Sequence, residues 1–158
     1  MSETNKRIPA SAAPAIVTTR VFAVAPATLF GAFSDPALLA KWWGPQDFTN
    51  TVQEYDFRPG GAWRITMRAP GGSEFPNESR FLEVVPPERI VFEHIGPMHR
   101  YWMTMEFAAV PGGTRLTWHM QFETVDEYTR LKDFIGPANE QNFNRLAACV
   151  SGQANPVR

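Results

Sequence analysis

The C-terminal segment from Val125 to Val150 constrains the fold most, because it is the long helical pattern of the chain. Thr124 and Glu127 form a capping box, in which a hydroxyl and a carboxylate three residues later bind free backbone N–H groups. The segment has two apolar stripes at helical spacing, Tyr128, Leu131, Phe134 and Ile135, then Phe143, Leu146, Ala147 and Val150. Gly136-Pro137 between them predicts a break or kink, since proline lacks an N–H group and clashes with the preceding turn.

Short runs typical of β-strands precede this helix. We expect seven strands, at Ile16–Val24, Thr51–Phe57, Ala62–Ala69, Glu78–Val85, Arg89–Ile95, Tyr101–Val110 and Thr114–Glu123. The later connections are too short for parallel crossovers, so the pattern predicts an antiparallel sheet. Pro26 and Pro36 suit the first position of a helix, which predicts two short helices after the first strand, the second ending at Trp43 before Gly44-Pro45.

Alternation within the strands predicts one buried and one solvated face of the sheet. The residues expected on the buried face are Trp63, Ile65, Met67, Phe81, Val85, Ile90, Phe92, His94, Tyr101, Met103, Met105, Phe107, Leu116, Trp118, Met120 and Phe122. Trp102, Thr104, Glu106, Arg115, Thr117, His119 and Gln121 are expected on the outer face. A sheet of this size must bury its apolar face, and the C-terminal helix is the segment long enough to cover it.

The chain is therefore expected to be one α+β domain over residues 16–150, with a disordered tail at 1–15 and a C-terminal tail at 151–158. Residues 1–15 have the composition of neither a signal peptide nor a membrane span, which predicts a cytoplasmic protein. The net charge is -1 and basic residues are not clustered, which argues against a nucleic-acid partner.

Motifs for common cofactors and metals are missing from the sequence. The single cysteine, Cys149, excludes an internal disulfide and a multi-cysteine zinc site, and His94, His99 and His119 do not have zinc-ligand spacing. There is no G-x-S-x-G, H-E-x-x-H or G-x-G-x-x-G pattern. We therefore assign no cofactor, no metal and no catalytic residue from sequence.

Four motifs carry a resemblance to a known family. They are Asp35-Pro36 with Lys41-Trp42-Trp43-Gly44-Pro45, the run from Asp56 to Trp63, the run from Pro86 to Phe92, and Gly113-Thr114-Arg115-Leu116-Thr117. From Ile16 to Val150 the chain resembles the activator of Hsp90 ATPase homologue (AHSA1-like) family of the START/Bet v 1-like (SRPBCC) superfamily. The resemblance implies a helix-grip fold: a seven-stranded curved antiparallel sheet wrapped around a long C-terminal helix, with a cavity between them.

The aromatic content suggests what this cavity holds. Twelve Phe, five Trp and six Met exceed what a plain core requires, and methionine suits adaptable apolar sites. We expect a small hydrophobic or aromatic ligand, bound by Trp42, Trp43, Trp63, Ile65, Met67, Phe81, Phe92, His94, Tyr101, Met103, Met105, Trp118, Met120, Phe134 and Phe143. Trp42 and Trp43 cannot share one role, because adjacent helical residues point about 100° apart.

Two other classes of function stay open at this stage. A cyclase or hydrolase of the same fold would use His94 as a general acid or base and Tyr101 to orient the substrate. A stand-alone Hsp90 co-chaperone-like domain would use an outer patch, for which Trp102 beside Arg100, Thr104 and His119 is the candidate. An outward tryptophan is equally compatible with a homodimer face.

Overall fold

The computed structural model describes residues 14–96 and 100–154, and side chains up to residue 151. The predicted N-terminal tail up to residue 13, the residues after 154 and His99 lie outside this range. The elements in chain order are β1 (Ala15–Phe22), α1 (Pro26–Ser34), α2 (Pro36–Trp42), β2 (Thr49–Tyr55), β3 (Ala62–Arg68), β4 (Glu74–Val85), β5 (Arg89–Gly96), β6 (Tyr101–Val110), β7 (Gly113–Phe122) and α3 (Val125–Ala154).

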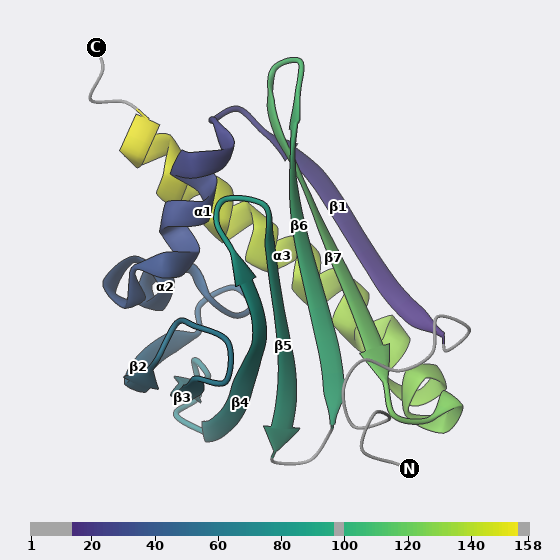
Figure 1. Ribbon diagram of the computed structural model, residues 1–158. Coiled ribbons are helices and arrows are strands. Elements are labelled where there is room, and N and C mark those ends of the chain that lie inside the picture. The colour runs from purple at the N-terminus through teal and green to yellow at the C-terminus, as the bar shows by residue number, and fades with distance from the viewer. Residues whose placement is uncertain (1–13, 97–99, 155–158) are drawn as a thin grey trace.

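The strands form one antiparallel sheet of seven in the order β1-β7-β6-β5-β4-β3-β2. The sheet curves around α3, and α1 and α2 pack beside the C-terminal part of that helix (Figure 1). This is the α+β helix-grip architecture that the sequence predicts. No helix of the described residues is long and apolar enough to cross a membrane.

Local sequence signals explain where the helices begin. Pro26 and Pro36 occupy first-turn positions, and the Asp35 carboxylate accepts a 2.9 Å hydrogen bond from the N–H of Ala37. The Thr124 hydroxyl accepts a 3.1 Å hydrogen bond from the N–H of Glu127, as a capping box requires. These contacts satisfy backbone donors that have no partner within the helix.

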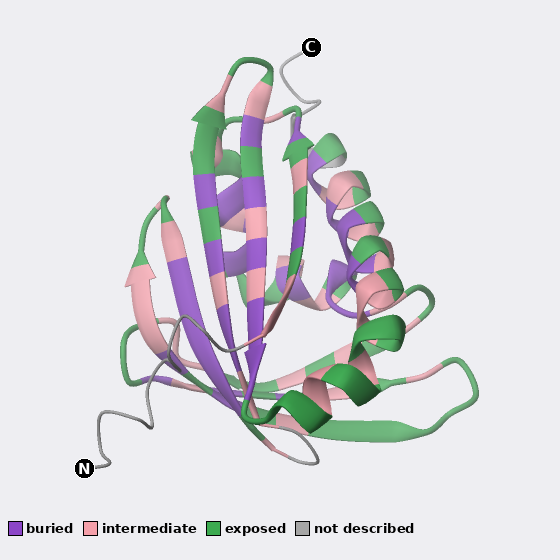
Figure 2. Ribbon diagram, turned by 90° about the vertical axis from the view of Figure 1, so that its right-hand side faces the viewer, coloured by how far each residue is buried: buried purple, intermediate pink, exposed green. Residues whose placement is uncertain are grey.

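Of the two outcomes predicted at Gly136-Pro137, a break or a kink, the break does not occur, because α3 is one helix with Pro137 in its interior. Figure 2 shows the N-terminal part of the helix running at an angle to the rest. Pro137 and Asp133, whose carbonyl loses its helical partner, are both exposed, so water can solvate that carbonyl. The helix also continues four residues beyond the predicted end at Val150.

The expected inward position of Val85 is wrong. A register shift between Phe81 and Glu83 in the β4–β5 pairing reverses the alternation, because a bulge moves every later side chain to the other face. Phe81, before the shift, is buried, whereas Val85, after it, is 43% exposed and Val84 packs on the core instead.

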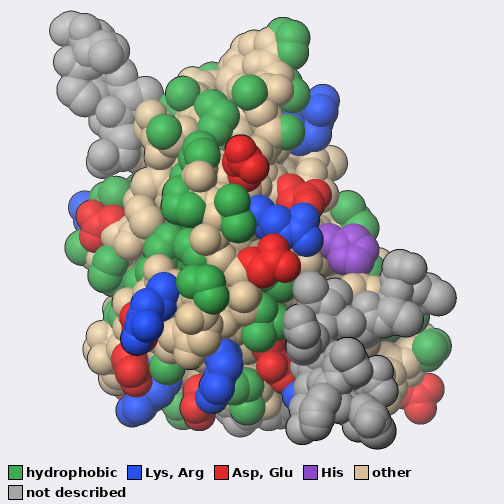
Figure 3. All heavy atoms as spheres, viewed as in Figure 1, with side chains coloured by type: hydrophobic (Ala, Val, Ile, Leu, Met, Phe, Trp, Pro, Cys, Tyr) green, Lys and Arg blue, Asp and Glu red, His purple; other side chains and the backbone are tan. Residues whose placement is uncertain are grey.

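Trp102 lies on the outer face of β6 but is only 4% exposed. The outer patch predicted around it therefore does not present a tryptophan side chain to solvent. The Arg100 guanidinium carbon lies 5.3 Å from the centre of its ring. Elsewhere on this face acidic and basic side chains lie next to one another (Figure 3), as where Arg89 contacts both Glu83 and Glu106.

Buried side chains fill one end of the space between the sheet and the helices. We call it the closed end, formed by buried side chains of α1, α2, the C-terminal half of α3 and the facing strands: Phe22, Leu29, Phe33, Leu39, Trp42, Met105, Phe107, Leu116, Phe143, Leu146 and Val150. Figure 2 shows the buried residues of α3 concentrated toward its C-terminus. The other end of the same space holds the candidate site.

Candidate functional site

A cavity of about 410 Å³ lies between the concave face of the sheet and α3. Its walls come from the segment after α2, from β3 to β7, and from residues 134–142 of α3. We call this the open end. The volume falls within the range of about 300–1,000 Å³ that is typical of small-molecule sites.

Eleven of the predicted ligand-binding residues line the cavity: Trp43, Trp63, Ile65, Met67, Phe92, His94, Tyr101, Met103, Trp118, Met120 and Phe134. They come from four strands (β3, β5, β6 and β7), from the residue directly after α2 and from α3. The alternation of β3, β6 and β7 brings them to one face, as the sequence predicts.

The other four predicted residues, Trp42, Phe81, Met105 and Phe143, do not line the cavity and belong to the buried core. The Trp42 indole N–H donates a 3.0 Å hydrogen bond to the carbonyl of Ala32. The Phe143 ring packs edge-on against Trp118 with centroids 4.7 Å apart. Periodicity identified the correct face for these residues, but it does not specify their depth.

Aromatic rings form the deep wall of the cavity. The Trp43 ring centre lies 4.9 Å from that of Trp63 and 5.6 Å from that of Trp118, and Phe92 lies 5.1 Å from Trp63. Most of these contacts are edge-to-face, a geometry that aromatic quadrupoles favour. The wall is therefore aromatic, polarisable and held by mutual contacts.

Polar side chains form a row across three neighbouring strands. Ser79 on β4 pairs with His94 on β5, and His94 pairs with Tyr101 on β6. The His94 and Tyr101 rings are stacked with centroids 4.6 Å apart. His94 Nε2 lies 2.6 Å from Asn77 Oδ1, while Asn77 Nδ2 donates to the carbonyl of Phe75, so this network assigns the Nε2 proton to His94.

Tyr101 differs from the histidine beside it. Burial raises the pKa of its phenol well above the ordinary value of 10.0, so the hydroxyl is protonated at neutral pH. Neither this hydroxyl nor that of Ser79 makes a hydrogen bond to any described residue. Both residues line the cavity, which gives it two hydroxyl groups without protein partners in the described range.

The segment that carries Trp43 into the cavity is fastened to α3. Arg145 Nη1 donates to the carbonyls of Trp43, Gly44 and Pro45 at 3.1, 3.1 and 2.8 Å, and its Nη2 donates to that of Lys41 at 3.0 Å. Burial lowers the pKa of Arg145, which nevertheless stays charged at neutral pH. This one guanidinium holds the turn that positions Trp43.

Asn142 and Gly44 complete this attachment. Asn142 Oδ1 accepts a 3.2 Å hydrogen bond from the Gly44 N–H. Gly44 has a φ of +98°, which side-chain-bearing residues rarely adopt, and a Cβ there would lie 2.8 Å from Met67 Cε. The turn therefore requires glycine for its backbone, and a Cβ there would also displace the terminal methyl group of Met67.

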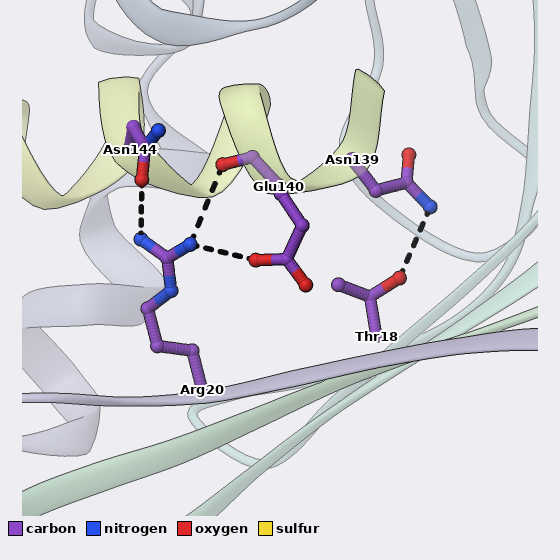
Figure 4. Close-up of polar contacts among 5 residues, drawn as sticks. All are labelled: Thr18, Arg20, Asn139, Glu140 and Asn144. Carbon is purple, nitrogen blue, oxygen red and sulfur yellow. Dashed lines mark hydrogen bonds and ion pairs between the residues drawn. The ribbon is translucent and has the colours of Figure 1, made fainter. Parts of the chain in front are cut away.

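A second set of contacts joins the middle of α3 to β1 (Figure 4). Arg20 donates to Asn144 Oδ1 at 2.8 Å and pairs with Glu140 Oε1 at 2.7 Å. Asn139 Nδ2 donates to the Thr18 hydroxyl at 3.3 Å. These contacts lie where the open end meets the closed end, so α3 is anchored beside the cavity.

Aromatic side chains also mark the entrance. Phe134 on α3 is 69% exposed and Phe75 on β4 is 40% exposed, although both line the cavity. Phe75 lies near Phe48, with centroids 6.3 Å apart. Phe134, expected inside, therefore lies at the rim and gives an incoming molecule an apolar surface.

Sequence reasoning missed ten lining residues: Gly44, Pro45, Phe48, Phe75, Asn77, Ser79, Ile135, Ala138, Asn139 and Asn142. Ile135 belongs to the predicted helical stripe, and β4 begins four residues earlier than expected, which brings in Phe75 and Asn77. The asparagines of α3 carry no signal of burial, because polar helical residues usually face water.

The lining contains no carboxylate, lysine or arginine among the described residues. The described part of the chain also has no group of three potential metal ligands. The site can therefore offer aromatic surface, a few neutral hydrogen-bonding groups and one imidazole.

The model of the family described as activator of Hsp90 ATPase homolog 1-like protein matches residues 23–151. A solved Chromobacterium violaceum protein is 30% identical with a TM-score of 0.75, over 85% of this chain and 96% of that one. A Nitrosomonas europaea protein is 22% identical with a TM-score of 0.82, over 92% and 99% of the two chains. The AHSA1 protein of Silicibacter pomeroyi is 23% identical with a TM-score of 0.73, over 89% and 99%. Among curated proteins no match is found.

Proposed function

The chain belongs to the activator of Hsp90 ATPase homolog 1-like family, and we propose that it is a binding protein for a small hydrophobic or aromatic molecule, held between the sheet and α3. The observation that carries the proposal is the contrast between the two ends of one interior. The closed end is packed with side chains, whereas the open end keeps about 410 Å³ between aromatic walls. The setting we propose is the cytoplasm.

The chemistry of the lining supports binding over catalysis. General acid–base catalysis requires a titratable group within reach of the reacting atoms and a partner that orients it. Asn77 orients His94 in the cavity, but no carboxylate lies among the described lining residues to act as a second acid or base. We therefore favour a binding role over a cyclase or hydrolase.

The interaction-module hypothesis has lost the observation that motivated it. Its candidate surface was an outward Trp102, and this side chain is 4% exposed. Trp102 is equally unsuited to the homodimer face considered from sequence. An Hsp90-linked role for this chain now has only the family name in its favour. We therefore base the proposal on the cavity.

Thermal-shift screening with apolar and aromatic metabolites, followed by calorimetric titration of the hits, tests the proposal. A ligand at 100 times its dissociation constant should raise the free energy of unfolding by about 2.7 kcal/mol. Met67→Ala, in the cavity wall, should weaken binding, whereas Val84→Ala, which changes a half-buried core contact, should not. Absence of saturable binding by any compound small enough for the cavity would contradict the proposal.

A further inference from the structure

We infer that the ligand is an uncharged aromatic molecule bearing a carbonyl oxygen, with the oxygen at the Tyr101 hydroxyl and the rings against Trp43 and Trp118. This inference rests on the proposed binding function and specifies the chemical class of its ligand. It follows from three features of the open end: the order of residues along β6, the hydroxyl groups without partners, and the absence of charge in the described lining.

The order of residues along β6 gives the cavity a direction. Tyr101 and Met103 line the cavity, whereas Met105 and Phe107, further along the same face, belong to the closed end. The polar row Ser79, His94 and Tyr101 is therefore further from the closed end than Phe92 and Met103. The difference is one inward-facing position along β5 and β6. A ligand with its rings toward the core has its far end at this row.

The polar row offers an unused hydroxyl donor to that far end. The Nε2 proton of His94 is directed to Asn77, so this donor is already used within the protein. The Tyr101 hydroxyl has no described partner and stays protonated. A hydroxyl that is removed from water without a partner costs about 1–3 kcal/mol, and a ligand oxygen that accepts its hydrogen bond removes this penalty.

The described lining has no lysine or arginine to neutralise a charged ligand. The guanidinium of Arg145, which holds the segment that carries Trp43, is directed to backbone carbonyls of residues 41–45. Arg20 is paired with Glu140 and Asn144 outside the cavity lining. A carboxylate moved from water into this cavity would lose solvation without gaining a cation, which excludes fatty-acid-like and phosphate-bearing ligands.

Three probes with one ring system separate these features. Acetylnaphthalene carries a carbonyl, ethylnaphthalene has the same shape without oxygen, and naphthoate carries a negative charge. We expect acetylnaphthalene to bind about tenfold more tightly than ethylnaphthalene, because one hydrogen bond distinguishes them. Naphthoate should bind at least about a hundredfold more weakly than acetylnaphthalene. Titration calorimetry at neutral pH measures all three dissociation constants.

Tyr101→Phe isolates the donor, because it removes the hydroxyl and keeps the ring that stacks on His94. The preference for acetylnaphthalene over ethylnaphthalene should fall from about tenfold to about twofold or less. Tyr128→Phe is the matched control, since Tyr128 is half-buried on α3 but does not line the cavity. It should leave the preference unchanged, and thermal unfolding of both variants verifies that they fold.

The outcomes distinguish this inference from the proposal beneath it. If ethylnaphthalene binds as tightly as acetylnaphthalene, or Tyr101→Phe keeps the preference, the cavity binds apolar molecules and the assigned donor is wrong. If naphthoate binds as tightly as acetylnaphthalene, the assigned neutral charge is wrong. If none of the three probes binds the wild-type protein while the thermal-shift screen finds other apolar ligands, the inference is wrong and the proposed binding function stands. Absence of saturable binding in both experiments contradicts both.

Discussion

The two halves of α3 face the same sheet but differ in how they are buried against it. Residues 139–150 bury Asn139, Asn142, Phe143, Leu146 and Val150, whereas residues 125–138 bury no side chain. The first half carries Leu131 and Ile135 half-buried and Phe134 largely exposed. One helix thus packs the core with residues 143–150 and covers the cavity with residues 134–142.

The difference shows how the fold separates stability from binding. At the closed end α1 and α2 add buried side chains that fill the space, and removal of atoms there should leave a cavity that the protein cannot close. At the open end the protein already keeps about 410 Å³ unfilled. Substitutions at the two ends should therefore separate into those that change unfolding and those that change binding.

Phe143→Ala should have the largest effect on stability. The side chain is fully buried and packs edge-on against Phe22 and Trp118. We expect the free energy of unfolding to fall by about 3–5 kcal/mol, measured by urea denaturation. A loss below about 1 kcal/mol would mean that the closed end is not tightly packed and would remove the contrast between the two ends.

Arg145→Met tests the attachment between the two ends. It retains most of the aliphatic stem but removes the guanidinium that binds four backbone carbonyls. We expect a loss of about 2–3 kcal/mol in unfolding free energy, together with weaker ligand binding, because Trp43 is no longer held. Unchanged binding would show that the position of Trp43 does not depend on this arginine.

Gly44→Ala should destabilise the protein by about 1–2 kcal/mol, because the backbone has a positive φ and the new methyl group displaces Met67. Gly31→Ala is the matched control, since Gly31 lies within α1 and has open space around its Cβ position. That variant should keep or slightly raise stability. Equal effects of the two changes in urea denaturation would contradict the special role of the Gly44 turn.

Phe134→Ser should have the smallest effect on stability, within about 0.5 kcal/mol, because the side chain is 69% exposed. Binding of an aromatic ligand should nevertheless weaken, since the variant loses apolar surface at the entrance. Val17→Ser, which changes an exposed side chain on β1 that does not line the cavity, should change neither quantity. If the Phe134→Ser variant binds as tightly as the wild type, the aromatic rim at the entrance does not contribute to ligand binding.

The sequence predicts the sheet faces well where two strands pair without irregularity. In β6 and β7 the alternation places Met103 and Met120 opposite each other on the concave face, as expected. It fails after Phe81, because a bulge in the pairing with β5 cannot be read from alternation within β4 alone. Val85 consequently lies on the other face.

Depth and environment are the features that the pattern cannot provide. Trp42 and Trp43 are adjacent, yet Trp42 bonds Ala32 within the core and Trp43 lines the cavity. Asn139 and Asn142 are polar residues on a helix, and only the tertiary structure shows that they are buried beside the cavity. Pro137 is tolerated because it lies on the exposed side of α3.

The most direct measurement compares tryptophan substitutions at two alanines of α3, by ligand binding and by unfolding free energy. Ala138 lines the cavity, whereas Ala147 packs against the closed end. Ala138→Trp should fill the open end, abolish acetylnaphthalene binding in calorimetric titration and change the free energy of unfolding by less than about 1 kcal/mol. Ala147→Trp should destabilise the protein by about 1–3 kcal/mol, since the indole enters a filled space. Wild-type affinity in Ala138→Trp, with its fold intact, would contradict the account that the open end is the binding site.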